Sequence, residues 1–194
     1  MINNIYDYEK LKSILKTMLS EKRFTHSVNV SIVAEDLAKK YGVDPQKAKI
    51  AGLLHDICKE MPDEENEKLI DKIPKDLNIC SRKILHGPAA SVYIKNEFGI
   101  DDEEILNAVK YHTTGRKNMS MLEKIIFTAD YISPERKWED LPQIYALAFQ
   151  NLDLAVLWEL STAIKACVYK KRCISKNTFE AYNESISKLE ETKQ

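Results

Sequence analysis

Histidines and aspartates that can bind a metal ion stand in the most apolar segments of the sequence. His55 and Asp56 follow one another in the segment 48–58, and Asp130 lies inside a second apolar segment, 125–132. A carboxylate without a partner in a dry core becomes protonated unless a cation holds it. Two such carboxylates on separate helices therefore indicate a shared cation. Imidazole nitrogen combined with carboxylate oxygen suits a divalent metal such as iron, manganese, zinc or nickel.

The positions of the other histidines support metal chemistry. His26 shares a helical face with Val30 and Val33, so it is expected to point inward. His112 ends another apolar stripe, and His86 stands in a loop just ahead of a helix. Taken singly, a histidine on an apolar face is more often a hydrogen-bonded core residue, and a His-Asp dipeptide indicates almost nothing. Their combination with two buried carboxylates favours a metal site.

Composition limits the classes of protein that this chain can belong to. It has 194 residues and a formal net charge of −1, which argues against binding nucleic acid through bulk positive charge. A small anionic ligand needs only a few local cations. The N-terminus shows no signal peptide, and charges interrupt the apolar stretch 144–169 before it could span a membrane. The four cysteines form no CxxC pair and are expected to be free thiols. We therefore predict a cytoplasmic protein without nucleic-acid or membrane partners.

The elements that must position these residues are predicted to be helices. Glycine is rare, with five in the chain, and runs of β-branched residues with a period of two are absent. Gly42 and Gly99 suit helix ends, whereas Gly52 inside a helix indicates that another element approaches closely. We expect one all-α domain over residues 1–194, with a metal-site core at about 20–136 and C-terminal helices packed on it. The expected helices span 5–21, 23–41, 45–59, 62–72, 88–98, 101–112, 119–133, 141–151, 153–172 and 177–191.

The C-terminal helices carry five aromatic side chains at helical spacing. Such a pattern is more often core packing than a ligand site, so we expect these residues to be buried. They are Tyr145, Phe149, Trp158, Tyr169 and Tyr182. Trp158 or Tyr169 could instead stack on a base.

Five short motifs resemble the YqeK family within the superfamily of HD-domain metal-dependent phosphohydrolases. They are Arg-Phe-Thr-His-Ser at 23–27, Ala-Gly-Leu-Leu-His-Asp-Ile-Cys-Lys at 51–59, Leu-His-Gly at 85–87, Tyr-His-Thr-Thr-Gly at 111–115 and Ala-Asp-Tyr-Ile-Ser-Pro-Glu-Arg at 129–136. The His-Asp pair alone is weak evidence, whereas the last two motifs are specific. The family often carries glutamate where Ser133 stands, so we assign no acidic role to that position.

The resemblance implies an HD-type helical fold, a reaction and a metal. Members of the family are symmetrical bis(5′-nucleosyl)-tetraphosphatases, earlier described as HD hydrolases linked to NAD metabolism. The implied reaction cleaves diadenosine tetraphosphate at its central bridge and gives two ADP. The implied ligands of an iron ion are His26, His55, Asp56 and Asp130, and manganese, cobalt or zinc are alternatives. His86 and His112 either complete a second metal position or face the phosphates, and the sequence leaves both open.

Cations and hydroxyls beside these motifs are candidates for binding phosphate. Arg23 lies one helical turn before His26 and shares its face, and Arg136 follows the motif around Asp130. Lys59 is a third cation, although most lysines and arginines taken singly are surface residues. The hydroxyls of Thr113 and Thr114 can donate, and Gly115 allows close backbone approach. The predicted catalytic residues are Asp56, His55 and Lys59, and the predicted substrate-binding residues are Arg23, His26, Asp56, His86, His112, Thr113, Asp130, Tyr131 and Arg136.

Other functions are compatible with the same residues. Another HD-type enzyme that dephosphorylates (d)NMP or (d)NTP would use the same metal ligands. A metal-dependent nucleotide sensor would bind without turnover, and a purely structural helical protein would hold no metal. The expected small-molecule partner is a dinucleoside polyphosphate or a nucleotide. A homodimer is left open by the sequence.

Overall fold

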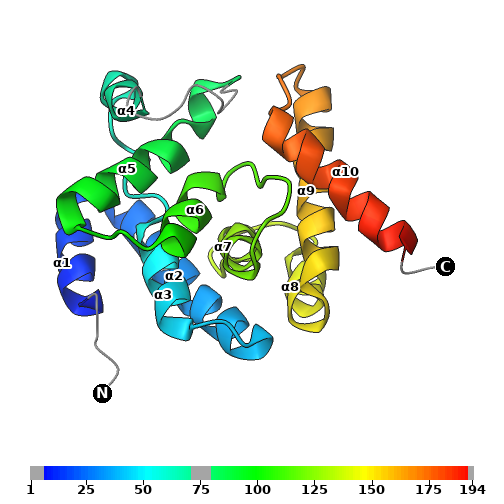
Figure 1. The fold of residues 1–194 in the computed structure, drawn as a ribbon, viewed down its shortest axis with the longest axis horizontal. Helices are drawn as coiled ribbons and strands as arrows, with labels where there is room; N and C mark the ends of the chain where they lie inside the picture. The colour runs from blue at the N-terminus through cyan, green and yellow to red at the C-terminus, as the bar shows by residue number, and fades with distance from the viewer. Residues whose placement is uncertain (1–6, 71–79, 192–194) are drawn as a thin grey trace.

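Every regular element that the structure describes is helical. The structure is a computed structural model and describes residues 7–70 and 80–191, in which there is no β-strand (Figure 1). This confirms the predicted all-α class. The elements are α1 (Tyr8–Met18), α2 (Glu21–Tyr41), α3 (Pro45–Leu54), α4 (Asp63–Ile70), the 3₁₀ helix η2 (Arg82–Ile84), α5 (His86–Phe98), α6 (Glu103–Tyr111), α7 (Met121–Tyr131), α8 (Leu141–Gln150), α9 (Leu152–Tyr169) and α10 (Lys176–Glu191).

Helices α2, α3, α6 and α7 lie in the middle of the molecule (Figure 1). Helix α2 packs along α3 and α7, and α6 packs on α3, α5 and α7. Helices α1, α4 and α5 lie at one end, and α8, α9 and α10 lie at the other. Helix α9 packs on α7, which joins the C-terminal helices to this middle group. No helix described in residues 7–70 and 80–191 is long and apolar enough to cross a membrane.

Two glycines allow helices to approach closely beside the histidines. A Cβ on Gly52 would lie 2.9 Å from the Cα of Ser31, so the predicted close approach of another element is confirmed as the contact of α3 with α2. A Cβ on Gly87 would lie 2.9 Å from the carbonyl oxygen of Lys110, at the contact of α5 with α6. Any side chain at either position would push the two helix backbones apart, and such overpacking destabilises a core.

The predicted helix 45–59 is too long, because α3 ends at Leu54. The next residues form tight turns, with hydrogen bonds from the Ile57 amide to the Leu54 carbonyl and from the Lys59 amide to the Asp56 carbonyl. Apolar periodicity continues through this segment, so the pattern does not mark the end of the helix. Consequently Asp56 lies in a turn rather than inside a helix.

Other boundaries also differ from the prediction. Helix α7 ends at Tyr131 instead of 133, and His86 is the first residue of α5 rather than part of a loop. Gly42 and Gly99 take left-handed conformations where α2 and α5 end, as predicted. Residues 5–6 and 71–72 of two predicted helices lie outside the described residues. The four cysteines are free, as expected.

The expectation that the C-terminal aromatic residues are all buried is wrong. Tyr169 is 87% exposed, and Trp158 and Tyr145 are about two-fifths exposed, at 41% and 39%. Phe149 and Tyr182 are partly buried and pack against the core. Helices α8, α9 and α10 form one end of the molecule (Figure 1), and no residue of α9 after Leu160 is buried. The helical pattern of aromatic residues therefore continues onto faces that the described chain leaves uncovered.

Candidate metal centre

All four histidines and two aspartates converge between the central helices. Each comes from a different element, apart from the adjacent pair His55–Asp56. The neighbouring imidazole rings touch edge to face, with centroids 4.9–5.2 Å apart. The contributing positions are His26 on α2, His55 and Asp56 after α3, His86 at the start of α5, His112 at the end of α6 and Asp130 near the end of α7. The structure thus brings together the residues that the sequence singled out.

The four predicted metal ligands face one another. His26 Nε2 lies 3.0 Å from Asp130 Oδ1 and 3.8 Å from Asp56 Oδ2. His55 Nε2 lies 3.6 Å from Asp56 Oδ2 and 3.9 Å from Asp130 Oδ1. Both Nε2 atoms are buried and have no hydrogen-bond partner. Buried polar atoms normally have partners, so these side chains fit a divalent metal ion that they would surround.

Asp56 also faces a second group of ligand atoms. Its Oδ1 lies 3.2 Å from His86 Nε2 and 3.5 Å from His112 Nε2, and this oxygen also lacks a hydrogen-bond partner. The two oxygens of one carboxylate therefore point to different groups, Oδ2 towards His26 and His55, and Oδ1 towards His86 and His112. Each group has three or more ligand atoms within 4.8 Å of one another.

Backbone carbonyls orient two of the histidine rings. His55 Nδ1 donates to the carbonyl of Gly52 and His112 Nδ1 donates to the carbonyl of Val109, each at 2.7 Å. A proton on Nδ1 leaves Nε2 as the ligand atom. Burial lowers the pKa of His55 and of His86 to about 4. Both rings are therefore neutral at pH 7, which is the form that binds metal.

Glu135 is a part of the site that the sequence analysis missed. It contacts His26 Nδ1 and accepts hydrogen bonds from Asn29 Nδ2 at 2.7 Å and Ser133 Oγ at 2.6 Å. Burial raises the pKa of Glu135, but these hydrogen bonds more than offset it and lower the pKa to about 2. Burial lowers the pKa of His26, yet the adjacent carboxylates of Asp130 and Glu135 more than offset this effect, so the pKa is raised. The signal was present in the motif 129–136, where an acidic role was considered only at Ser133.

Replacing Glu135 with glutamine is expected to weaken metal binding by about 10- to 100-fold. The amide keeps the shape but loses the charge that fixes the ring of His26, and partners of this kind contribute that much to metal affinity. Titration of the apo-protein with Mn²⁺ measures the change. Glu139→Gln, an exposed carboxylate in the same loop, is the matched control. Equal affinities for the Glu135 variant and the wild type would contradict an orienting role.

The predicted phosphate-binding cations lie against the carboxylates. Arg23 Nη1 donates to Asp56 Oδ2 at 2.7 Å. Arg136 contacts Asp130 through Nη2, and its Nε donates to the Asp130 carbonyl at 3.1 Å. Lys59 Nζ lies 3.9 Å from Asp56 Oδ1. Burial raises the pKa of Asp56, but the neighbouring imidazoles of His55, His112 and His86 more than offset this effect and hold the pKa well below its usual range. Asp56 is therefore ionised at neutral pH.

The remaining candidates divide between the site and its surroundings. Thr113 Oγ1 lies 3.1 Å from His112 Nε2, so its hydroxyl belongs to the cluster. Thr114 is buried and its hydroxyl donates to the carbonyl of Gly115, which is a structural role within the turn. The ring of Tyr131 stacks on Trp138 with centroids 5.9 Å apart. The structure therefore does not bring the Tyr131 ring to the histidines.

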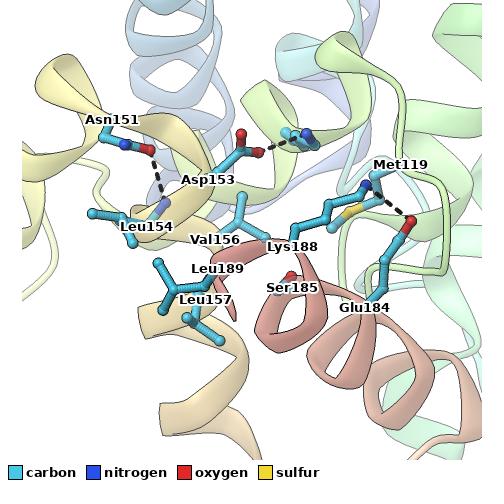
Figure 2. Close-up of a pocket in the computed structure, with 11 residues that line it drawn as sticks. Met119, Asn151, Asp153, Leu154, Val156, Leu157, Glu184, Ser185, Lys188 and Leu189 are labelled. Atoms are coloured by element: carbon cyan, nitrogen blue, oxygen red, sulfur yellow. Dashed lines mark hydrogen bonds and ion pairs between the residues drawn. The ribbon is translucent and has the colours of Figure 1, made fainter. Parts of the chain in front are cut away.

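A separate cavity of about 150 Å³ lies between α9 and α10 (Figure 2). Its two lysines are already paired, Lys124 with Asp153 at 2.6 Å and Lys188 with Glu184 at 2.9 Å. None of the predicted site residues is among the described residues that line it. The chemistry of the chain therefore centres on the histidine cluster.

An all-helical fold built around buried histidines and a His-Asp pair defines the class of HD hydrolases. The sequence pattern of the HD domain matches residues 23–135, which include every residue of the cluster and Glu135. The chain belongs to the HD domain family. It is an HD-type nucleotide phosphohydrolase whose His/Asp cluster is suited to a divalent metal ion.

The similarity to known proteins extends over nearly the full length of this chain. The symmetrical bis(5′-nucleosyl)-tetraphosphatase of Halalkalibacterium halodurans is 38% identical over 179 residues, covering 91% of this chain and 96% of the relative. The enzyme of the same name from Bacillus subtilis is 34% identical over 181 residues, covering 92% and 97%. The crystal structure of a predicted HD superfamily hydrolase involved in NAD metabolism from Clostridium acetobutylicum is similar with a TM-score of 0.90 and 40% identity, covering 94% and 98%.

Proposed function

We propose that the chain hydrolyses diadenosine tetraphosphate at the central phosphoanhydride bond and releases two ADP. The observation that carries this proposal is the buried His/Asp cluster with Arg23, Arg136 and Lys59 at its edges. Metal ligands flanked by fixed cations suit the hydrolysis of a highly anionic substrate. The symmetrical tetraphosphatases of Halalkalibacterium halodurans and Bacillus subtilis, which are similar to this chain over most of its length, support the symmetrical reaction.

The residues proposed to hold the metal are His26, His55, Asp56 and Asp130. Unpartnered buried atoms of His26, His55 and Asp56, together with the mixed nitrogen and oxygen donors of the set, suit iron, with manganese, cobalt or zinc as alternatives. A divalent ion held by these residues would lower the pKa of a water molecule towards neutrality and would polarise a phosphoryl oxygen. Asp56, held in its ionised form, can orient an attacking water by accepting its hydrogen bond.

The flanking side chains supply the positive charge that the phosphates need. Arg23 and Arg136 have planar guanidinium groups that can form paired hydrogen bonds with phosphate oxygens. We infer that each exchanges a carboxylate partner for a phosphate when substrate binds. Lys59 and the Thr113 hydroxyl lie beside His86 and can donate to the leaving diphosphate.

We infer that His86 and His112 face the phosphates rather than a second metal ion. The ammonium of Lys59 lies 3.0 Å from His86 Nε2 and 3.9 Å from Asp56 Oδ1. A fixed cation at this position opposes a second divalent cation and attracts an anion. Metal analysis of the reconstituted protein is expected to give about one equivalent per chain.

Product analysis tests the reaction. The protein is incubated anaerobically with Fe²⁺, or with Mn²⁺ as a stand-in, and with diadenosine tetraphosphate, and the nucleotides are separated by chromatography. ADP is expected to be the only product. ATP together with AMP would contradict symmetrical cleavage. Activity restricted to (d)NMP or (d)NTP would assign the same site to a nucleotidase, and metal binding without turnover would assign it to a sensor.

A further inference from the structure

A basic cavity opens beside the metal centre and is not explained by the metal ligands. It has a volume of about 370 Å³, and its lining comes from the turn after α3, from α4, from η2 and from the start of α5. The described residues that line it are all polar: Lys59, Asp63, Asn66, Arg82, Lys83 and His86. Three of these described residues are cationic and one is anionic, so the part of the lining that the structure describes has a net positive charge. Such a lining suits an anion and not an apolar ligand.

Two lining residues connect this cavity to the histidine cluster. His86 Nε2 lies 3.2 Å from Asp56 Oδ1 and 3.0 Å from Lys59 Nζ. A phosphate chain bound in the cavity could therefore extend directly to the metal ligands.

Among the described residues, the acidic partners of Arg82 and Lys83 are weak or absent. Arg82 Nη1 is 3.6 Å from Asp63 and its Nη2 is 3.6 Å from Glu67, and the Arg82 side chain is 68% exposed. Long, exposed ion pairs contribute little, so either can be exchanged for a phosphate. In the part of the chain that the structure describes, the ammonium of Lys83 has no acidic partner. Both side chains are presented by the single turn η2.

Cations lie on both edges of the Asp56 carboxylate. Arg23 contacts Oδ2, whereas Lys59 lies on the side of Oδ1, next to the neutral ring of His86. A substrate with two equal phosphate halves that is cut in the middle needs positive charge on both sides of the reacting atoms. One diphosphate would face the arginines, and the other would extend past Lys59 towards Arg82 and Lys83.

We propose that the cavity lined by Lys59, Arg82 and Lys83 binds the diphosphate of the second nucleoside half, the half that leaves as ADP. This inference rests on the proposed function and makes Arg82 and Lys83 residues that select a long dinucleoside polyphosphate. Their contacts would be present both before and during the reaction. Loss of such uniform binding raises KM and leaves kcat nearly unchanged.

The double variant Arg82→Ala/Lys83→Ala tests the proposal in the metal-loaded protein. KM for diadenosine tetraphosphate is expected to rise about 10- to 100-fold, with kcat changed less than about threefold. The conservative variant Arg82→Lys/Lys83→Arg is expected to have a KM close to that of the wild type. The control Lys40→Ala/Lys95→Ala removes the same charge from exposed positions elsewhere on α2 and α5. A KM within twofold of the wild type in the alanine variant, or an equal rise in the control, would overturn the proposal.

Calorimetric titration with ADP separates this inference from the proposed function, since it does not depend on turnover. The Mn²⁺-loaded wild type is expected to bind two ADP molecules per chain, and the alanine variant is expected to lose or weaken one of them at least tenfold. The same number of ADP sites with the same affinities in the two proteins would overturn the cavity assignment, even if ADP is the reaction product. Loss of one ADP site in a protein that does not cleave the tetraphosphate would reject the proposed function and retain the cavity as a nucleoside diphosphate site.

Discussion

Asp56→Asn is expected to reduce the turnover of diadenosine tetraphosphate by about 10³-fold or more, equivalent to about 4 kcal/mol in the activation barrier. Asp56 is 2% exposed and its two oxygens face the two halves of the histidine cluster. The asparagine side chain has nearly the same volume, but it offers one neutral oxygen instead of two charged ones. It would therefore weaken the metal site and leave Arg23 without its anionic partner at the same time.

Steady-state rates with saturating Mn²⁺ measure this effect, and far-UV circular dichroism reports whether the helices persist. Asp36→Asn on α2 is the matched control, because that carboxylate is about half exposed and its ion pair with Lys39 is 3.5 Å long. The control is expected to retain wild-type turnover. A folded Asp56 variant whose turnover stays within tenfold of the wild type would contradict the central place of this carboxylate.

The metal site was predictable because its residues break a strong pattern. Asp56 and Asp130 are charged residues in segments that are otherwise devoted to the core, and a buried charge requires a partner. Helix ends marked by glycine were also predictable, as Gly42 and Gly99 show. Gly52 indicated the close contact of two helices. Glycine inside a helix destabilises it, so its presence suggests that a neighbouring element leaves no room for a Cβ.

What the sequence could not show depends on tertiary contacts. The sequence analysis missed the end of α3 at Leu54 because the apolar pattern continues past that residue. The hydrogen bond from the His55 ring to the Gly52 carbonyl, formed at this helix end, is visible only in the structure. Glu135 resembles an ordinary loop carboxylate until the structure places it against His26. Tyr169 is exposed because it is the last residue of α9 and no residue of this helix after Leu160 is buried, which helical spacing alone does not reveal.

Removal of divalent metal with a chelator is expected to abolish hydrolysis and to lower the melting temperature. Without a cation, Asp56 and Asp130 face each other across a buried cluster in which both Nε2 atoms of His26 and His55 lack partners. A ligand at about 100 times its dissociation constant stabilises the folded state by about 2.7 kcal/mol. For a chain of this length that corresponds to a shift of about 5–10 °C. Differential scanning calorimetry with and without added Mn²⁺ measures it.

The His26→Ala variant distinguishes a bound metal from a general effect of salt or chelator. It removes one proposed ligand, so Mn²⁺ is expected to restore neither activity nor the melting temperature of this variant at concentrations that restore both in the wild type. A wild-type melting temperature that does not respond to Mn²⁺, together with hydrolysis that survives chelation, would contradict the metal assignment. The thermal shift is informative on its own, because binding at the cluster stabilises the fold whichever phosphate ester or anhydride the protein cleaves.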